Sequence, residues 1–444
     1  MSKILQLRQA ARAIFDESLR AVDPGAAVRR AVQFKGTTVS IGDLDLSNRC
    51  IYAIALGKAS LAMAGALDTI LGKSLTGGLL IDPRRFTLDQ EISLPKPWFC
   101  CTGGHPLPTD GSLFAAEQAL KLLDRANTER ALVIFLVSGG GSAMIEWPIS
   151  SEINLGNIRM ANRTLVGCGA SITEINAVRR TFSFIKGGRL AGKAPNCDQI
   201  TLIVSDVRAG EEWNVASGPT LRPPKNAPKG QEIIERYQLR PLLPEPILRA
   251  IDSDDGTLPL DNSTNVRKHF VLLDNDTALE AAATAARKRG LTVEIARDIS
   301  DEPIEAGVQK LLKHLSELKS SHAGDVCLVS GGEFSCPVRG DGLGGRNLET
   351  ALRLAILAEE HRDQIGEFVA LCAGTDGIDG NSRAAGAIVD STTIERARRI
   401  GLDPTDFVER SDAYSFFVAL GDVITTGPTG TNVRDLRILL AGRM

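Results

Sequence analysis

The sequence has little of what marks several large classes of protein. Aromatic residues make up 5% of it, and its 51 basic and 54 acidic residues leave a formal net charge of -3. Proteins that bind nucleic acids usually carry a basic surface and aromatic stacking platforms, so nucleic acid is not an expected partner. No apolar run reaches membrane-spanning length, so no membrane partner is expected either. The composition predicts a globular protein.

Cysteine and histidine are too scattered to indicate a metal site or a disulfide framework. The eight cysteines contain no C-x-x-C spacing, and only Cys100 and Cys101 are adjacent. The five histidines show no metal-ligand spacing, so none is assigned as a catalytic base. The opening segment MSKILQLRQAARAIFDESLRAV carries charge from Lys3 onward and has apolar residues at helical spacing. It predicts an amphipathic helix and not an export signal, and hence a cytoplasmic location.

The length of the chain favours two domains. At 444 residues it exceeds one typical domain, and its 43% hydrophobic content can fill two cores. A proline-rich stretch interrupts the pattern between Leu221 and Pro259. We therefore predict a Rossmann-like parallel-sheet domain over 1–225, a crossover over 226–265 and an α/β domain over 266–444. Residues 24–34 are expected to form a second helix.

Apolar strands in both domains run directly into polar or glycine-rich turns. In the first domain IYAIAL precedes Gly57-Lys58, ALVIFLV precedes SGGGS and QITLIV precedes Ser205-Asp206. The strand KHFVLL is expected to open the second domain, where DVCLVSGGE leads to GDGLGGRN and EFVALCAG leads to Thr375-Asp376. Open α/β sheets bind ligands at the carboxyl ends of their strands. The recurrence of such turns therefore predicts a ligand-binding cleft.

The residues in these turns suit an anionic ligand. Glycine-rich turns before helices present backbone N–H groups to a phosphate. Lys58 and Arg346 add positive charge, and the arginine fork matches phosphate or carboxylate. Asp206 suits either Mg²⁺ or a hydroxyl nucleophile. Each residue also has an alternative interpretation without a ligand: Lys58 as an exposed lysine, Arg346 as a solvated arginine, and aspartates such as Asp376 as turn-forming residues. Taken together, the turns favour phosphoryl transfer, which depends on positioning and charge neutralisation.

The same motifs carry a family resemblance along almost the whole chain. They are, in order, LGKAS, GGHPLPTDGS, SGGGSA, NAVRRTFSFIKGGRLA, SDV…ASGPT, SGGE…VRGDGLGGRN, AGTDGIDG and TGPTGTNVRDL. The chain thereby resembles class II glycerate kinases, the glycerate 2-kinase family with a DUF4147 domain followed by a MOFRL domain. The resemblance implies a two-domain α/β fold with the active site between the domains. It also implies ATP- and Mg²⁺-dependent phosphorylation of D-glycerate at the 2-hydroxyl, giving 2-phosphoglycerate and ADP.

The resemblance also implies roles for individual residues. By motif, the catalytic residues are Lys58, Asp206 and Arg346. The nucleotide is expected to contact Ser138, Gly139, Gly140, Gly141, Ser142, Gly344, Gly345, Asn347 and Asp376. The glycerate carboxylate needs a cation, for which the candidates are Lys58, Arg179, Lys186 and Arg189. Asp206 is either the base or the Mg²⁺ ligand, and both roles stay open. Replacing Arg346 by alanine is expected to abolish most turnover without unfolding the protein.

Two motifs depart from the pattern of the family. Relatives commonly read SDVPGDD where this chain reads SDVRAGEE, so the acidic character survives at Glu211 and Glu212 in a different local sequence. In the motif usually written GGRNQE, Leu348 replaces the glutamine, while Arg346 and Asn347 are retained.

Two other functions are weighed against the kinase. An NAD(P)H-dependent hydroxypyruvate reductase would use Gly340 to Gly345 as a dinucleotide fingerprint. An acid that closes a strand should then follow roughly twenty residues later, whereas Glu359 and Glu360 end an expected helix. A regulatory nucleotide-binding module is disfavoured because the lysine, aspartate and arginine are all present. The oligomeric state is left open, with a homodimer as one option.

Overall fold

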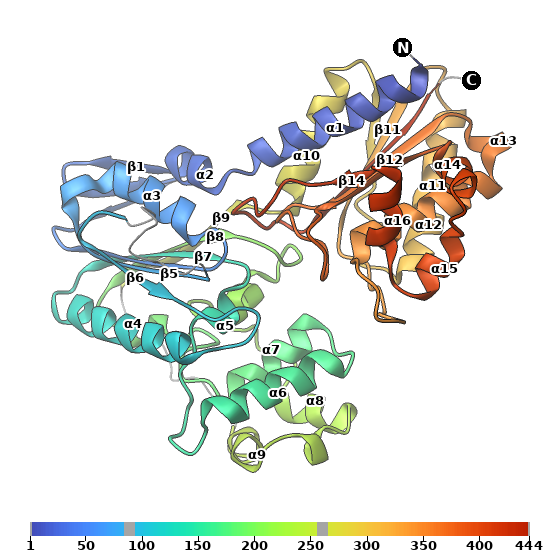
Figure 1. The fold of residues 1–444 in the computed structure, drawn as a ribbon. Coiled ribbons are helices and arrows are strands. Elements are labelled where there is room, and N and C mark those ends of the chain that lie inside the picture. The colour runs from blue at the N-terminus through green and yellow to red at the C-terminus, as the bar shows by residue number, and fades with distance from the viewer. Residues whose placement is uncertain (1, 84–93, 255–264, 443–444) are drawn as a thin grey trace. The chain divides into compact units, whose positions relative to one another are not determined.

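The computed structural model describes residues 2–83, 94–254 and 265–442 (Figure 1). The chain divides into two compact parts, and each has its own sheet and core. The N-terminal part spans Pro24–Leu273, and the C-terminal part combines Met1–Asp23 with Asp274–Met444. Within the described ranges, no helix combines the length and the apolar character needed to cross a membrane. The expected position of the active site between the domains stays a prediction.

The N-terminal part is built on a parallel sheet. Its described strands follow the order β6-β5-β4-β7-β8-β9, and all neighbours are parallel. Their bounds are β4 Ile51–Leu56, β5 Leu75–Asp82, β6 Trp98–Thr102, β7 Leu132–Ser138, β8 Asp198–Val204 and β9 Arg267–Leu273. Every residue of β4 and β7 is buried, as expected for strands covered on both faces. Helices α3 (Ser60–Leu71) and α4 (Asp110–Thr128) lie on opposite faces of the sheet (Figure 1). This strand order is that of the Rossmann fold and confirms the prediction.

Two expectations about this part are wrong. Strand β9, expected to open the C-terminal domain, pairs in parallel with β8 and completes the first sheet. Residues 24–34 are only partly helical, because α2 (Pro24–Ala31) gives way to β1 (Val32–Lys35). The turn at Gly36, whose φ is +64°, then leads into the antiparallel strands β2 (Thr38–Ile41) and β3 (Leu44–Ser47). Glycine adopts this positive φ without steric cost.

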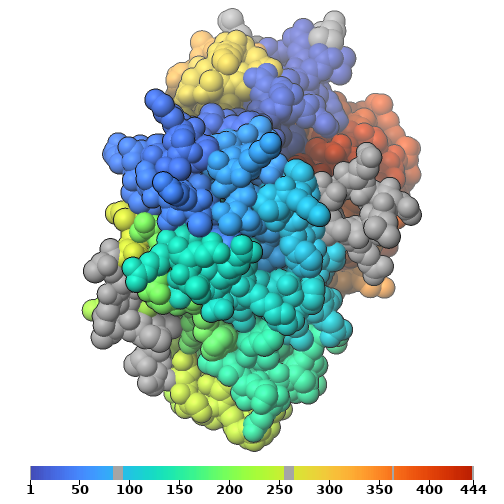
Figure 2. All heavy atoms as spheres, turned by 90° about the vertical axis from the view of Figure 1, so that its left-hand side faces the viewer, coloured from blue at the N-terminus to red at the C-terminus, as the bar shows by residue number. Residues whose placement is uncertain are grey.

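The proline-rich stretch, expected as a crossover over 226–265, forms packed structure in its described portion. Helices α8 (Gly230–Arg236) and α9 (Glu245–Asp252) pack with α6 (Leu155–Gly167) and α7 (Ile172–Thr181). Their shared core includes Ile158, Val178, Ile233 and Ile247. These helices form the lower end of the surface in Figure 2, below α4. They therefore belong to the N-terminal part as a helical layer, while residues 255–264 lie outside the described ranges.

The C-terminal part has a mixed sheet. Its described strands follow the order β10-β11-β15-β12-β13-β14, in which β10 and β11 are parallel and the other neighbours antiparallel. The bounds are β10 Thr292–Ile295, β11 Val326–Gly332, β12 Phe368–Gly374, β13 Gly386–Asp390, β14 Val423–Ile424 and β15 Asp435–Ala441. The helices are α10 Asn275–Arg287, α11 Ile304–Ser320, α12 Arg346–Glu360, α13 Arg362–Ile365, α14 Thr393–Arg399, α15 Pro404–Glu409 and α16 Ala413–Leu420. The part is thus an α/β domain, as predicted.

The opening helix α1 (Lys3–Ala21) is amphipathic, as its sequence predicts. The side chain of Ser2 caps it by accepting a hydrogen bond from the N–H of Leu5. Although it comes first in the chain, it packs against α10 and β12 of the C-terminal part (Figure 1). Arg8 forms ion pairs with Asp390 and Asp422, which are almost fully buried. The helix is therefore a structural element of the C-terminal part.

Phe15 is the largest apolar side chain that α1 buries, with 0% of its surface exposed. Phe15→Ala should destabilise the C-terminal part by about 3–5 kcal/mol, because it leaves a cavity between α1, α10 and the sheet. Thermal unfolding followed by circular dichroism measures the change. Leu5→Ala on the same helix is the control, because 44% of Leu5 is exposed. Equal effects of the two substitutions would show that α1 is not held as described.

Candidate active site

The parallel sheet creates a binding position between β4 and β7. The chain leaves β4 toward one edge of the sheet and leaves β7 toward the other, so the strand order reverses between them. In open α/β sheets, ligands bind at the carboxyl ends of the strands at such a reversal. Here those ends carry Gly57-Lys58 and Ser138-Gly139-Gly140. Two of the motifs predicted from the sequence therefore lie side by side.

Hydrogen bonds fix these two turns to each other. The backbone N–H of Lys58 donates to the carbonyl of Gly139 at 2.9 Å. The N–H of Ala59 donates to the Ser138 hydroxyl at 3.0 Å, and this hydroxyl in turn donates to the carbonyl of Leu56 at 3.3 Å. Ser138 is fully buried, and its hydroxyl links the two turns, so its predicted nucleotide contact stays a prediction for its backbone groups. The loop geometry is thereby set before any ligand binds.

Three polar side chains gather around Gly139 and Gly140. A Cβ on Gly139 would overlap the carboxylate of Asp206. A Cβ on Gly140 would lie 3.1 Å from Cγ of Lys58 and 3.3 Å from Nε2 of His105. The structure therefore brings the predicted Lys58 and Asp206 to adjacent glycines and adds His105 beside them. We call these three side chains and the two glycines the glycine-loop site.

His105 is a residue that sequence reasoning did not select. It follows β6 after Gly103-Gly104, at the same sheet edge as the other turns. Its side chain is exposed beside the Gly140 backbone. The strand ending in a polar, glycine-rich turn was the signal that could have identified it, since that pattern marked Lys58 and Asp206.

The remainder of the SGGGS turn, Gly141 and Ser142, packs against β4 and bonds to the 3-10 helix η3 (Glu212–Ser217). Gly141 begins α5 (Gly141–Met144), and a Cβ there would lie 2.8 Å from Cγ of Leu56. The hydroxyl of Ser142 lies 2.6 Å from that of Ser217, which donates to the side chain of Asn176 at 2.8 Å. The Ser142 hydroxyl is taken up by Ser217, and Gly141 has no side chain. The predicted phosphate contacts of Gly141 and Ser142 therefore stay predictions for their backbone groups.

Two of the predicted glycerate-binding cations have internal partners. Lys186 is 2% exposed and forms an ion pair with Glu146, which also accepts a hydrogen bond from Ser183 at 2.6 Å. Arg179 donates to the side chain of Asn162 at 2.6 Å, and burial lowers its pKa to about 10. Removing either cation would leave buried groups without a partner. Arg189 differs, because it lines a cavity as well as contacting Asp254 at 3.7 Å.

The acidic loop after Asp206 uses its carboxylates locally. Glu211 accepts a hydrogen bond from Thr173 at 3.0 Å, and Glu212 accepts one from the N–H of Gly210 at 2.8 Å. Among the residues that the structure describes, no group of three or more His, Cys, Asp or Glu side chains is arranged to hold a metal. A Mg²⁺ ion that binds together with nucleotide phosphates needs only one or two protein carboxylates. Asp206 at the glycine loop fits that requirement.

The second glycine-rich turn surrounds a cavity in the C-terminal part. This cavity of about 380 Å³ is lined by Gly344, Gly345 and Arg346 at the start of α12, together with Asp379 and Asn381. Arg346 forms ion pairs with Asp435 at 2.6 Å and with Glu333 at 2.8 Å. Burial opposes its charge, but Asp435 and Glu333 outweigh burial and raise the pKa of Arg346. About a third of the side chain, 36%, stays exposed.

The other predicted residues of this part have structural contacts as well. Asn347 donates to Asp435 at 2.9 Å and to Asp379 at 3.2 Å. Leu348, which replaces the glutamine of the family motif, is fully buried in the core. Asp376 accepts a hydrogen bond from the N–H of Ile378 at 3.2 Å, so it forms the turn that was the alternative to nucleotide binding. Its predicted nucleotide contact is not tested by this arrangement.

Asp379 holds the start of α12 in place. Its carboxylate accepts hydrogen bonds from the backbone N–H groups of Asn347 at 3.1 Å and Leu348 at 2.8 Å. These are first-turn N–H groups, which have no partner inside the helix. Burial raises the pKa of Asp379 to about 7, and the nearby charge of Asp435 adds to the effect.

This raised pKa predicts a pH dependence of stability. Because the folded pKa of Asp379 exceeds its ordinary value of 3.8, the folded protein binds the proton more tightly. The contribution to stability is complete below pH 3.8 and is lost as the pH rises toward 7. Between pH 5 and 7 this loss amounts to about 2 kcal/mol. Thermal unfolding midpoints should therefore fall more steeply with pH in the wild type than in Asp379→Asn. Asp376→Asn is the control, and identical slopes in all three proteins would contradict the prediction.

Comparison with known proteins agrees with this architecture. Two family models match: a domain of unknown function, DUF4147, over residues 10–252, and the MOFRL family over residues 326–435. A glycerate 2-kinase from Pyrococcus horikoshii is 32% identical over 98% of both chains. A protein of Agrobacterium vitis with a provisional hydroxypyruvate reductase name is 35% identical over 89% of this chain and 100% of its own.

A solved structure gives the same result for the fold. The crystal structure of a glycerate kinase from Thermotoga maritima matches this chain with a TM-score of 0.80 at 30% identity, covering 98% of this chain and 99% of that one. The motif resemblance, both family models and near-complete coverage of relatives agree. The chain therefore belongs to the glycerate 2-kinase family, with a DUF4147 region followed by a MOFRL region.

Proposed function

We propose that this enzyme transfers a phosphoryl group from ATP to the 2-hydroxyl of D-glycerate, giving 2-phosphoglycerate and ADP. The observation that carries the proposal is the glycine-loop site, where Lys58, His105 and Asp206 surround Gly139 and Gly140 at the sheet reversal. A cation, a carboxylate and close backbone approach are the groups that phosphoryl transfer requires. The glycerate 2-kinase from Pyrococcus horikoshii and its relatives support the choice of acceptor.

In this proposal the hydroxyl oxygen of glycerate forms a bond to the γ-phosphorus while the bond to the bridging oxygen of ADP breaks. Asp206 orients the hydroxyl and accepts its proton. Lys58 neutralises the charge on the transferring group. The hydrogen bond from its backbone N–H to the carbonyl of Gly139 fixes the position of its Cα and Cβ atoms. Mg²⁺, bound with ATP, would neutralise phosphate charge. Asp206 would hold this ion in place of acting as the base, so the two roles of Asp206 are alternatives.

Arg346 would add a second positive charge through its exposed edge. Its ion pairs with Asp435 and Glu333 fix the direction of the guanidinium. Gly344 and Gly345 line the cavity beside it, so backbone groups and the guanidinium are available to the same anion. Of the other cations named from the sequence, only Arg189 lines a cavity among those described, and neither Lys58 nor Asp206 lines that cavity. Its contact with the glycerate carboxylate therefore stays a prediction.

The glycine-rich turn at Arg346 does not have the context of a dinucleotide fingerprint. Glu359 and Glu360, where an acid closing a strand would be needed, lie at the end of α12. The sheet beside this turn is mainly antiparallel. Both features favour the kinase over the hydroxypyruvate reductase.

Purified protein distinguishes the two activities. ADP formation, measured by chromatography, should require D-glycerate, ATP and Mg²⁺ together. A parallel reaction with hydroxypyruvate and NAD(P)H should show no loss of absorbance at 340 nm. Oxidation of NAD(P)H without any ADP formation would overturn the proposal in favour of the reductase.

Gly139→Ala tests the geometry of the glycine-loop site. The added Cβ would overlap the Asp206 carboxylate and displace it, so kcat should fall by about 10²-fold. Gly167→Ala is the matched control, because a Cβ at Gly167 meets no atom within 4 Å. If Gly139→Ala keeps the activity of the control, Asp206 does not act from the position described.

A further inference from the structure

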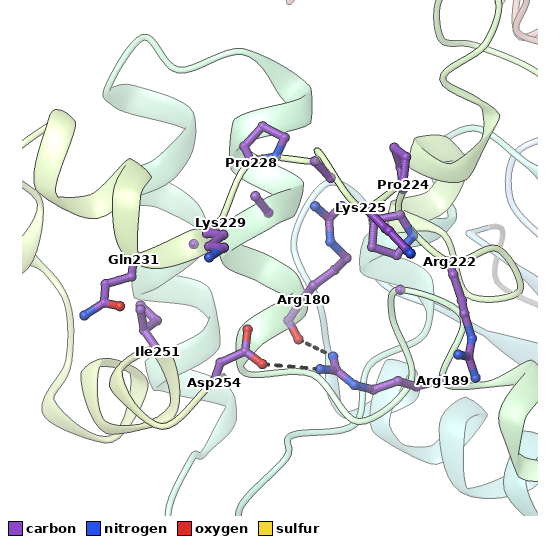
Figure 3. A pocket seen from close by; sticks show the side chains of 15 residues that line it. Arg180, Arg189, Arg222, Pro224, Lys225, Pro228, Lys229, Gln231, Ile251 and Asp254 are labelled. Atoms are coloured by element: carbon purple, nitrogen blue, oxygen red, sulfur yellow. Dashed lines mark hydrogen bonds and ion pairs between the residues drawn. The ribbon is translucent and has the colours of Figure 1, made fainter. Parts of the chain in front are cut away.

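The N-terminal part contains a second cavity with an unusual charge balance. This cavity, of about 450 Å³, lies between the end of α7, the Gly187 turn, the proline-rich segment 222–230 and the end of α9 (Figure 3). Its charged lining residues are five cations and one carboxylate: Arg180, Arg189, Arg222, Lys225, Lys229 and Asp254. Neither Lys58 nor Asp206 lines it, so it is separate from the glycine-loop site. The excess of positive charge suits an anionic ligand.

Arg180 is the buried cation of this cavity. Only 7% of it is exposed, and its guanidinium points into the cavity in Figure 3. It lies 5.0 Å from the centre of the Trp213 ring and donates weakly to Asn214 at 3.4 Å. Within the described ranges no carboxylate is within ion-pair distance of it. A buried cation without a carboxylate is costly, which indicates a position kept for a ligand.

Electrostatics leave this arginine charged. Burial and, to a smaller extent, the neighbouring Arg189 lower the pKa of Arg180 to about 10, while the charge of Asp254 acts in the opposite direction. The guanidinium is still protonated at neutral pH. Arg189 itself donates to the carbonyls of Arg180 and Ser183 and lies 3.7 Å from Asp254, so its position is fixed by the protein. Among the described residues, Asp254 therefore forms an ion pair with Arg189 and acts on Arg180 only from beyond ion-pair distance.

Two glycines allow the arginines to lie against the backbone. A Cβ on Gly187 would lie 2.8 Å from Cδ of Arg180, and one on Gly188 would lie 2.8 Å from Cγ of Arg222. Both glycines have positive φ, +65° and +83°. Any other residue at either position would push an arginine out of place. The KGGR motif of the sequence thus builds this wall of the cavity.

The rim formed by the proline-rich segment 222–230 carries two exposed lysines. Lys225 and Lys229 lie on a segment whose prolines 223, 224 and 228 restrict its backbone. In the part of the chain that the structure describes, neither lysine has an ion-pair partner. The cations of this rim and of the arginine wall therefore face one space.

The cavity is coupled to the glycine-loop site through one short segment. The 3-10 helix η3 (Glu212–Ser217) carries Trp213 and Asn214, which contact Arg180. The same segment carries Ser217, whose hydroxyl lies 2.6 Å from that of Ser142 and whose carbonyl accepts from the N–H of Gly187 at 3.2 Å. A ligand that moves Arg180 would therefore act on the SGGGS turn.

We propose that this cavity binds a phosphate-bearing ligand with at least two negative charges. Its two sources under the proposed function are the diphosphate of the nucleotide and the phosphorylated hydroxy acid. The shared chemistry is a phosphate group held by Arg180 and the two lysines.

Calorimetric titration of the full chain with inorganic pyrophosphate tests the site. Binding should appear, and its affinity should weaken with added salt. Arg180→Gln should weaken binding by about tenfold or more, since it removes a charged hydrogen-bond donor. The double variant Lys225→Gln/Lys229→Gln should also weaken binding. Both lysines are exposed, so these substitutions should leave the fold intact. Lys73→Gln, an exposed lysine of the same part, is the control and should bind as the wild type does.

Further titrations identify which phosphate-bearing ligand binds and distinguish this cavity from the glycine-loop site. ADP binding more tightly than 2-phosphoglycerate identifies the nucleotide, and the reverse order identifies the phosphorylated acid. Lys58→Ala should retain pyrophosphate binding, which separates this cavity from the glycine-loop site. Ligand binding should also change tryptophan fluorescence in the wild type and not in Trp213→Phe. Absence of binding, or binding that Arg180→Gln and the double lysine variant leave unchanged, would overturn the proposal, whether or not the protein is a kinase.

Discussion

Lys58→Ala is expected to lower kcat by about 10²–10³-fold, the usual cost of removing one preorganised charge from a transition state. The side chain of Lys58 lies beside Gly140, and its backbone N–H bonds to Gly139. Alanine keeps that backbone bond, so the turn and the fold should be preserved. The loss should therefore appear in kcat and leave the unfolding midpoint unchanged.

Two further variants sharpen this result. Lys58→Arg keeps the charge but not its position, and should recover only part of the activity. Lys73→Ala removes an exposed lysine of the same part and should leave kcat unchanged. Activity of Lys58→Ala within about twofold of the wild type, measured as ADP formation, would remove Lys58 from the mechanism.

Arg346→Ala is expected to lower both activity and stability. Sequence reasoning predicts a loss of turnover without unfolding, but the structure pairs Arg346 with Asp435, whose side chain is only 4% exposed. Removing the arginine leaves that carboxylate beside Asp379 with a hydrogen bond from Asn347 and without its cation. The expected cost is about 3 kcal/mol, measured by thermal unfolding.

Arg346→Lys separates the two effects. The lysine restores a positive charge to Asp435, so much of the lost stability should return. It cannot reproduce the arginine fork, so kcat should stay low. Full stability together with full activity in Arg346→Ala would show that the ion pair and the catalytic role are both absent.

Patterns local to the chain predicted most of the elements. IYAIAL is β4 to the residue, and SGGGS follows β7 as expected, because continuous apolar runs are typical of buried parallel strands. Pairing between distant segments was harder to predict. The partner of KHFVLL is β8, a choice set by the open edge of the first sheet and not by the sequence of the strand itself.

Side-chain partners were the least predictable features of the site. Lys58 and Asp206 were found because each follows a strand in a recognisable turn. The burial of Lys186 against Glu146 joins residues forty positions apart, and no local spacing signals it. Arg180 was passed over for the same reason, since its lack of a carboxylate is visible only once Trp213 and Asn214 are placed beside it.

³¹P NMR of the reaction products tests whether the enzyme phosphorylates the 2-hydroxyl of D-glycerate. Purified protein is incubated with D-glycerate, ATP and Mg²⁺, and the spectrum is compared with those of authentic 2-phosphoglycerate and 3-phosphoglycerate. A growing 2-phosphoglycerate signal is expected together with ADP, and both should be greatly reduced in Lys58→Ala. A 3-phosphoglycerate signal would contradict the assigned hydroxyl, and the absence of any phosphorylated product would contradict the kinase itself.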